Sequence, residues 1–342
     1  MLNKQDQASW KQFFAVAEAF QEIAPWRWME DRHIFRIHCT IDDELYYCSI
    51  LGNGGEVFGL CMYPGEVGLA SLLSLYEAEM YDGGGVPPLS LYEQRCLRLD
   101  ITEIDYLPED YRELYQQLGR EIGSGEERYI VLQDIHPGLV PKQPSPDKVA
   151  VATEVLTSAL ELAKNYQHKV ATLDRAMEMN TLPARYLNEQ GQPVIEYVKM
   201  PEVELLWTTQ ALPALTVRSI TKLPVQDQIQ VLLIFHIPGQ VIQESPDEDA
   251  FYPLIILWVN GENGMIEDLE ISQPQELKVK LLSIIATKFS EQGFRPSQLA
   301  VSDPLVAKAV MEMCQQLGIT LLIAPSELVN EIFNSLAQRL MS

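Results

Sequence analysis

The sequence predicts an α/β protein of two mixed-sheet domains, each with the element order βββαβαβα, which implies an internal duplication. The chain has 342 residues, too many for one ordinary domain of about 100 to 200 residues and about right for two. Each half begins with three strand-like segments and continues with alternating helical and strand-like segments, which predicts a meander of three antiparallel strands that leads into parallel strands. Both halves join the second and third strands through an Asn-Gly turn, within GNGGE (52–56) and NGENG (260–264).

The first half opens with an amphipathic helix, in which Trp10, Phe13, Ala17 and Phe20 fall on one stripe. Such a stripe is typical of core packing and not of a ligand site. Period-two and period-3.6 hydrophobic patterns then alternate along the chain. Strands are expected at 34–39, 44–51, 56–63, 95–101 and 128–134, and helices at 66–80, 108–118 and 145–166.

The second half repeats this order, with acidic residues and proline at helix starts, where both are favourable. Strands are expected at 229–237, 251–260, 264–272, 298–303 and 319–325, and helices at 274–289, 304–317 and 326–340. Residues 167–227 contain a hairpin pattern followed by a linker. The predicted organisation is therefore an N-terminal domain (1–166), a connecting hairpin and linker (167–227) and a C-terminal domain (228–342).

The glycine-rich stretch 50–69 predicts a hairpin and not a phosphate-binding loop. A phosphate loop follows a strand and opens a helix, because the helix amino terminus supplies free N–H groups. Here a second strand pattern follows, and Val57 stands where the third glycine of G-x-G-x-x-G belongs. We therefore expect no nucleotide cofactor at this stretch.

Composition excludes several classes of protein. Asp and Glu number 48 against 25 Lys and Arg, and the net charge of -23 disfavours nucleic-acid binding. No apolar run reaches the roughly 18 residues of a membrane helix, and the amino terminus carries no export signal. The five cysteines form no C-x-x-C pair and fit reduced core positions. The sequence thus predicts a cytoplasmic protein that does not span a membrane.

Two resemblances follow from these patterns. The phrase ILGNGGEVFGLCMYPG, preceded by PWRWM, resembles a hairpin phrase of bacterial proteins of unknown function, which implies a bacterial cytosolic family without an assigned activity. The order of elements in each half resembles the ribonuclease H-like fold. That resemblance implies two divalent cations, held by carboxylates from the first strand, the first and last helices and the end of the fourth strand.

The expected carboxylates are incomplete in both halves. In the second half Asp303 ends the fourth strand, but the first strand, 229–237, contains no acid. In the first half Asp100, Asp134 and His136 are candidates, but the first strand offers only His38, and imidazole suits Mg²⁺ poorly. Asp303 precedes Pro304, which predicts a helix cap that Asn should replace without loss.

The leading hypothesis is a non-catalytic binding or regulatory protein on a degenerate enzyme-like fold, with no metal and no cofactor. The competing hypothesis is a metal-dependent phosphoesterase or nuclease that uses Asp100, Asp134 and His136. Whether the protein is an enzyme therefore stays open at this point. The sequence leaves a protein partner or a homo-oligomer open and names no ligand.

Overall fold

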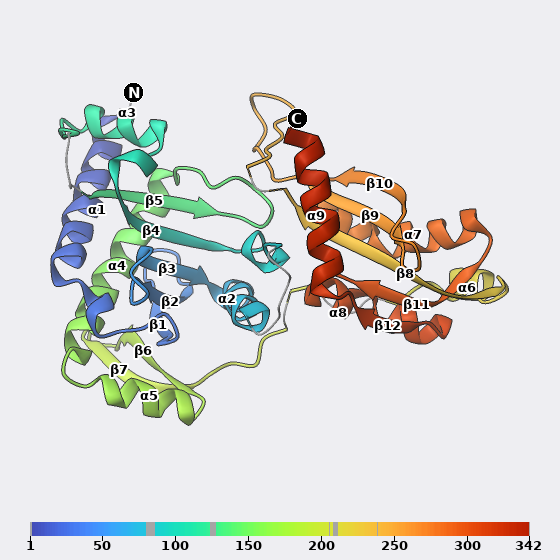
Figure 1. Ribbon diagram of the computed structural model, residues 1–342. Helices are drawn as coiled ribbons and strands as arrows, with labels where there is room; N and C mark the ends of the chain where they lie inside the picture. Colours follow the sequence, from blue (N-terminus) through green and yellow to red (C-terminus); the bar gives the residue numbers. More distant parts are fainter. Residues whose placement is uncertain are drawn as a thin grey trace. The chain divides into compact units, whose positions relative to one another are not determined.

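The computed structural model describes residues 2–79, 86–123, 128–204, 206–207, 211–237 and 239–341, the last seven of them by their backbone. The chain divides into two compact units, each built on one mixed sheet, which confirms the predicted α/β class (Figure 1). The first unit comprises Met1–Leu69, Arg95–His136 and Pro141–Val203, and the second comprises Ala70–Gln94, Pro137–Val140 and Glu204–Ser342. Residues 70–94 and 137–140 thus group with the second unit, whereas the sequence-based division keeps them in the first domain.

The sheet of the first unit has seven strands in the order β5-β4-β3-β2-β1-β6-β7. Strands β1 to β5 form an antiparallel meander, and β6 pairs parallel with β1 and antiparallel with β7. The strands are β1 (Phe35–His38), β2 (Leu45–Leu51), β3 (Phe58–Pro64), β4 (Cys96–Thr102), β5 (Tyr129–Ile135), β6 (Thr181–Leu187) and β7 (Pro193–Lys199).

This pairing corrects the expectation that parallel strands follow the meander in the first half. A strand can be added parallel only when its connection crosses the sheet, usually as a helix. The connection from β3 to β4 runs through residues 70–94, which group with the second unit, so β4 returns antiparallel beside β3. Helix α4 (Pro146–Tyr166) lies on the sheet instead, and β6 follows it beside β1. The strand order of this sheet therefore gives no support to a duplication.

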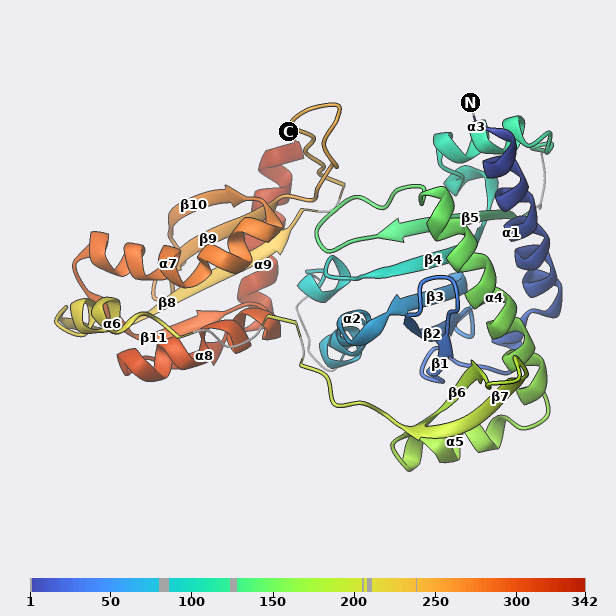
Figure 2. The ribbon, with the colours of Figure 1, turned by 180° about the vertical axis from the view of Figure 1, so that it is seen from behind.

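Helices α1 (Lys4–Ile23) and α4 pack together on one face of this sheet (Figure 2). The aromatic stripe of α1 is fully buried there, as its spacing predicts. The predicted hairpin is confirmed between β2 and β3, although the positive φ angles fall on Gly52 and Gly55 and not on Asn53-Gly54. The other helical elements of the unit are η1 (Pro25–Arg27), η3 (Ile104–Tyr106), α3 (Glu109–Gln117) and α5 (Val170–Glu178).

The sheet of the second unit has five strands in the order β10-β9-β8-β11-β12. The first three form an antiparallel meander, and β11 and β12 extend it in parallel from β8. The predicted meander followed by two parallel strands is therefore confirmed for this half. The strands are β8 (Val225–His236), β9 (Leu254–Asn260), β10 (Ile266–Ser272), β11 (Arg295–Val301) and β12 (Thr320–Ile323).

Helices cover both faces of this sheet, because β8 and β9 are apolar on both sides. Helices α7 (Pro274–Gln292) and α8 (Pro304–Leu317) pack on one face with Ile234 and Trp258. Helix α9 (Ser326–Met341) lies on the other face, against Leu233 and Leu257 (Figures 1 and 2). A short helix, α6 (Ala214–Ile220), precedes β8.

The remaining part of the second unit comes from the middle of the first half. Helix α2 (Gly65–Glu79) leads into this part, and η2 (Leu89–Leu91) lies near its end. We call residues 86–94 the anchor segment, because Leu89 lies in the α7/α8 core and Val86 packs against the α9 core. This segment brings a piece of distant sequence to the carboxyl ends of β8 and β11.

The five cysteines are buried and are free thiols, in agreement with the core positions expected from the sequence. In the described part of the chain, helices fall short of the length and apolarity that crossing a membrane demands.

Candidate functional site

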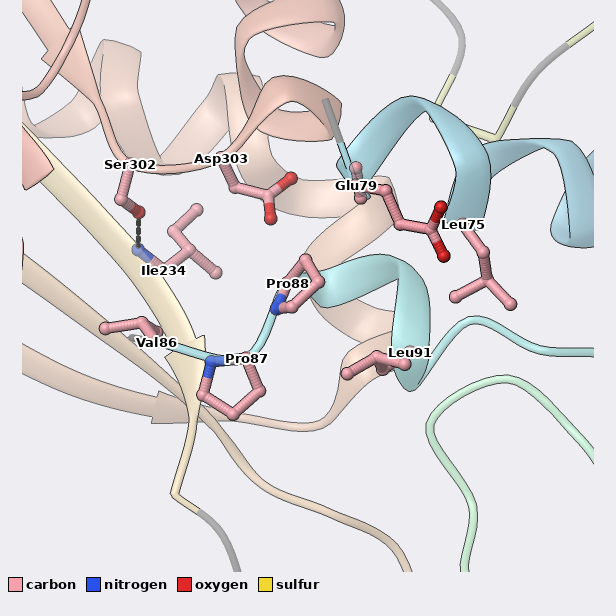
Figure 3. Close-up of a pocket in the computed structure, with 10 residues that line it drawn as sticks. Leu75, Glu79, Val86, Pro87, Pro88, Leu91, Ile234, Ser302 and Asp303 are labelled. Carbon is pink, nitrogen blue, oxygen red and sulfur yellow. Dashed lines mark hydrogen bonds between the residues drawn. The ribbon is translucent and has the colours of Figure 1, made fainter. Parts of the chain in front are cut away.

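A pocket of about 360 Å³ lies beyond the carboxyl ends of β8 and β11 in the second unit (Figure 3). Ligands of open α/β sheets usually bind at this edge, outside the carboxyl ends of parallel strands. Most of the lining is apolar, and its polar members are one serine and two carboxylates. The lining residues are Leu75, Ala78, Glu79, Val86, Pro87, Pro88, Leu91, Ile234, Ser302 and Asp303.

Asp303 is positioned by the junction between β11 and α8. It is the N-cap of α8, in extended conformation, and its Oδ1 accepts a hydrogen bond from the Leu305 N–H at 2.8 Å. Pro304 follows at the first helical position, where the missing N–H is not needed. The predicted role of Asp303 as a helix cap is confirmed.

The second oxygen of Asp303 has a partner from the anchor segment. Oδ2 accepts from the backbone N–H of Leu89 at 3.0 Å, and this bond is buried. Asp303 itself is 5% exposed, so burial raises the pKa of its carboxyl, and the nearby Glu93 charge raises it further. The backbone N–H donors of Leu89, Leu305 and Val306 act in the opposite direction, because they stabilise the ionised form.

Two more contacts hold the anchor segment in place. The buried carboxylate of Glu93 forms an ion pair with Lys278 on α7. The ring of Tyr92 lies against His236 at the end of β8, with ring centroids 4.0 Å apart. His236 donates from Nδ1 to the Pro253 carbonyl at 3.1 Å, and burial lowers its pKa to about 4, so the ring is neutral at pH 7.

The other polar group in the pocket is also engaged. Ser302 Oγ accepts a hydrogen bond from the Ile234 N–H at 3.3 Å, which ties β11 to β8 at the pocket wall (Figure 3). Glu79, at the end of α2, is exposed. The pocket therefore has a largely apolar wall and two carboxylates, one buried and one facing solvent.

The candidates Asp134 and His136 come together in the first unit, at the end of β5. Asp134 Oδ1 lies 3.0 Å from His136 Nε2, and Asp134 Oδ2 lies 2.7 Å from Lys148 Nζ. Lys148 Nζ is also 3.3 Å from His136 Nε2. An ammonium group thus occupies the position between the two candidates.

The third candidate, Asp100, lies apart from them. In the β4–β5 ladder Asp100 is opposite Val131, whereas Asp134 is opposite Leu97. The two aspartates are three positions apart along this ladder, and strand alternation sends their side chains to opposite faces of the sheet. Asp100 Oδ2 accepts instead from Arg98 Nε at 2.9 Å, and burial raises its pKa although Arg98 partly compensates.

Within the described ranges, no three His, Cys, Asp or Glu side chains gather closely enough to hold a metal ion. Two residues that shape the sites were not predicted from the sequence. Lys148 sits in the first turn of α4, where a lysine carries no signal of its own. Leu89 contributes its backbone N–H, and that partner is 214 positions from Asp303 in sequence.

Two family models match the chain. A domain of unknown function (DUF7309) matches residues 10–184, and a second domain of unknown function (DUF6930) matches residues 216–337. No curated protein and no solved structure matches the chain.

Proposed function

The chain belongs to the family described as a domain of unknown function, DUF7309, and on that premise we propose that it is a non-catalytic protein that binds a small, largely apolar molecule. The binding site is the pocket at the edge of the second sheet, formed by α2, the anchor segment, β8 and the start of α8. Its volume is at the low end of the range of about 300 to 1,000 Å³ that small-molecule sites occupy.

The single observation that carries this proposal is the state of Asp303. Both of its oxygens accept backbone N–H groups, one from α8 and one from the anchor segment. A two-metal phosphoesterase needs several carboxylates whose charge is directed at the cations. Here the neighbouring β8 residue is Ile234, and Asp303, the one carboxylate among the described residues at the ends of β8 and β11, is used to hold the structure together.

The other polar groups near the pocket support binding over catalysis. The Ser302 hydroxyl accepts from a backbone N–H, and His236 donates to a carbonyl beneath Tyr92. His236 is not among the pocket-lining residues, so it is not placed to act as a base for Ser302. A nucleophile needs such a base within hydrogen-bond reach.

The direct test is whether the protein binds a neutral apolar compound, n-hexanol. Calorimetric titration and shifts of methyl resonances measure this binding. The substitution Ala78→Trp fills the pocket and should weaken binding at least about tenfold, which is 1.4 kcal/mol. Glu77→Trp adds the same side chain at an exposed neighbouring position that does not line the pocket. If wild type does not bind hexanol, or if both variants bind it as wild type does, the pocket is not the site.

The competing proposal is a metal-dependent phosphoesterase at Asp134 and His136. It predicts that millimolar Mn²⁺ raises the melting temperature of the first unit, and that Asp134→Asn abolishes the rise. We rank it second because the Lys148 ammonium lies where the cation would have to bind. Hydrolysis of bis(p-nitrophenyl) phosphate that depends on Mn²⁺ and on Asp134 would reverse this ranking.

A further inference from the structure

The ionisable residues that line the pocket all carry charge of one sign. Its two ionisable lining residues, Glu79 and Asp303, are both carboxylates, and the described lining contains no Lys, Arg or His. A third acid, Glu93, lies close enough to raise the pKa of Asp303, although Lys278 neutralises its charge. The net charge of the whole chain, -23, has the same sign. The pocket therefore presents a negative field to whatever enters it.

The carboxylates also have room for a further hydrogen-bond donor. Each carboxylate oxygen can accept two hydrogen bonds, so the two Asp303 oxygens offer four acceptor positions, of which the backbone N–H groups of Leu89, Leu305 and Val306 use three. Figure 3 shows the carboxylates of Asp303 and Glu79 along one side of the pocket, and Pro87 and Leu91 along the other. A ligand with an apolar body and a donor group at one end would meet both kinds of surface.

We propose that the pocket selects a small apolar molecule that carries an ammonium group, that is, an aliphatic amine in its protonated form. This inference rests on the proposed function, because it uses the same pocket. An anion of the same shape would face two like charges, and a neutral alcohol would forgo the charge-assisted hydrogen bond that an ammonium makes to a carboxylate. Charge thus determines which six-carbon compound binds best.

The test compares three compounds that share one alkyl chain: n-hexylamine, n-hexanol and hexanoate. They are titrated into the full-length protein near pH 7.5, where a primary amine is protonated as lysine is. The amine should bind at least about tenfold more tightly than the alcohol, and hexanoate should bind most weakly. Added NaCl should weaken binding of the amine and leave binding of the alcohol unchanged, because salt screens exposed charge.

Variants then assign the charge effect to the two carboxylates. Glu79→Gln should weaken binding of the amine about two- to fivefold, as expected for an exposed ion pair. Glu270→Gln makes the same change on the exposed strand β10, outside the pocket, and should have no effect. Asp303→Asn should weaken binding of the amine at least about tenfold, because the ammonium group loses a buried charged partner. Since this change also loosens the anchor segment, hexanol binding by the same variant is the reference.

The outcomes separate this inference from the proposed function. Equal binding of amine and alcohol, or tighter binding of hexanoate, would refute the charge selection and leave the apolar pocket standing. Loss of amine and alcohol binding by the same factor in Asp303→Asn, with no effect of Glu79→Gln, would also refute it. If none of the three compounds binds, both the inference and the proposed function fail.

Discussion

The replacement Asp303→Asn gives the sharpest test of how the second unit is held together. From the sequence alone this change should be neutral, since Asn caps a helix about as well as Asp. The structure predicts a loss instead. Oδ1 accepts from Leu305 N and Oδ2 accepts from Leu89 N. An amide keeps one of these acceptors and replaces the other with an NH₂ group, which then faces a backbone N–H as donor against donor.

The magnitude follows from the burial of the Leu89 bond. A buried N–H that loses its acceptor costs about 1 to 3 kcal/mol, so Asp303→Asn should destabilise the second unit by that amount. Asp303→Ala also loses the cap, which adds about 0.5 to 2 kcal/mol. Relief from burying a carboxylate offsets part of both losses. At about 2 to 4 °C per kcal/mol for a domain of 150 to 250 residues, the Asn variant should melt about 2 to 12 °C lower.

Calorimetry of the two variants measures the loss, and amide hydrogen exchange at Leu89 shows where it arises. The matched control is Asn3→Asp at the N-cap of α1, where one side-chain oxygen accepts both cap bonds and no second segment is attached. The substitution Asn3→Asp should change the free energy of unfolding by no more than about 0.5 kcal/mol. If Asp303→Asn has the melting temperature of wild type and the Leu89 amide exchanges at the wild-type rate, the hydrogen bond from Leu89 to Asp303 contributes nothing to stability and the reasoning is wrong.

Two further predictions concern the residues around the anchor segment. Burial lowers the pKa of His236 to about 4 in the folded protein, against about 6.5 in the unfolded chain, so between these values the unfolded state binds the extra proton. Stability therefore decreases as the pH is lowered through this interval, by roughly 3 kcal/mol in full. His236→Asn keeps an N–H donor without the titration, so urea unfolding at pH 7.5 and 4.5 should show a smaller pH effect for the variant, and an equal effect would contradict the assignment. Glu93→Gln leaves Lys278, 29% exposed, without its buried counter-ion and should cost about 1 to 2 kcal/mol in urea unfolding, less than a fully buried pair. The double variant Glu93→Gln, Lys278→Met should recover part of that loss, and a double variant no more stable than the single one would argue against the ion pair as the cause.

The sequence by itself determined the features that depend on near neighbours. Alternating and helical hydrophobic periods located the strands and helices, since each period reports which side of one element is buried. The Ser-Asp-Pro phrase before α8 identified Asp303 as a cap, because its acceptor reaches an N–H two residues away. The element order of the second half also predicted its sheet correctly, with the meander of β8 to β10 extended by two parallel strands.

Only the tertiary structure decided where distant segments meet. In the first half the same element order gave a different sheet, because the connection between β3 and β4 runs through residues that group with the second unit. Asp100 and Asp134, both plausible ligands in sequence, were sent to opposite faces by the register of β4 and β5. The bond from Asp303 to Leu89 spans 214 positions, and no local pattern marks a backbone N–H as its partner. Periodicity records which face of an element is buried, whereas the path of the chain determines which other element covers that face.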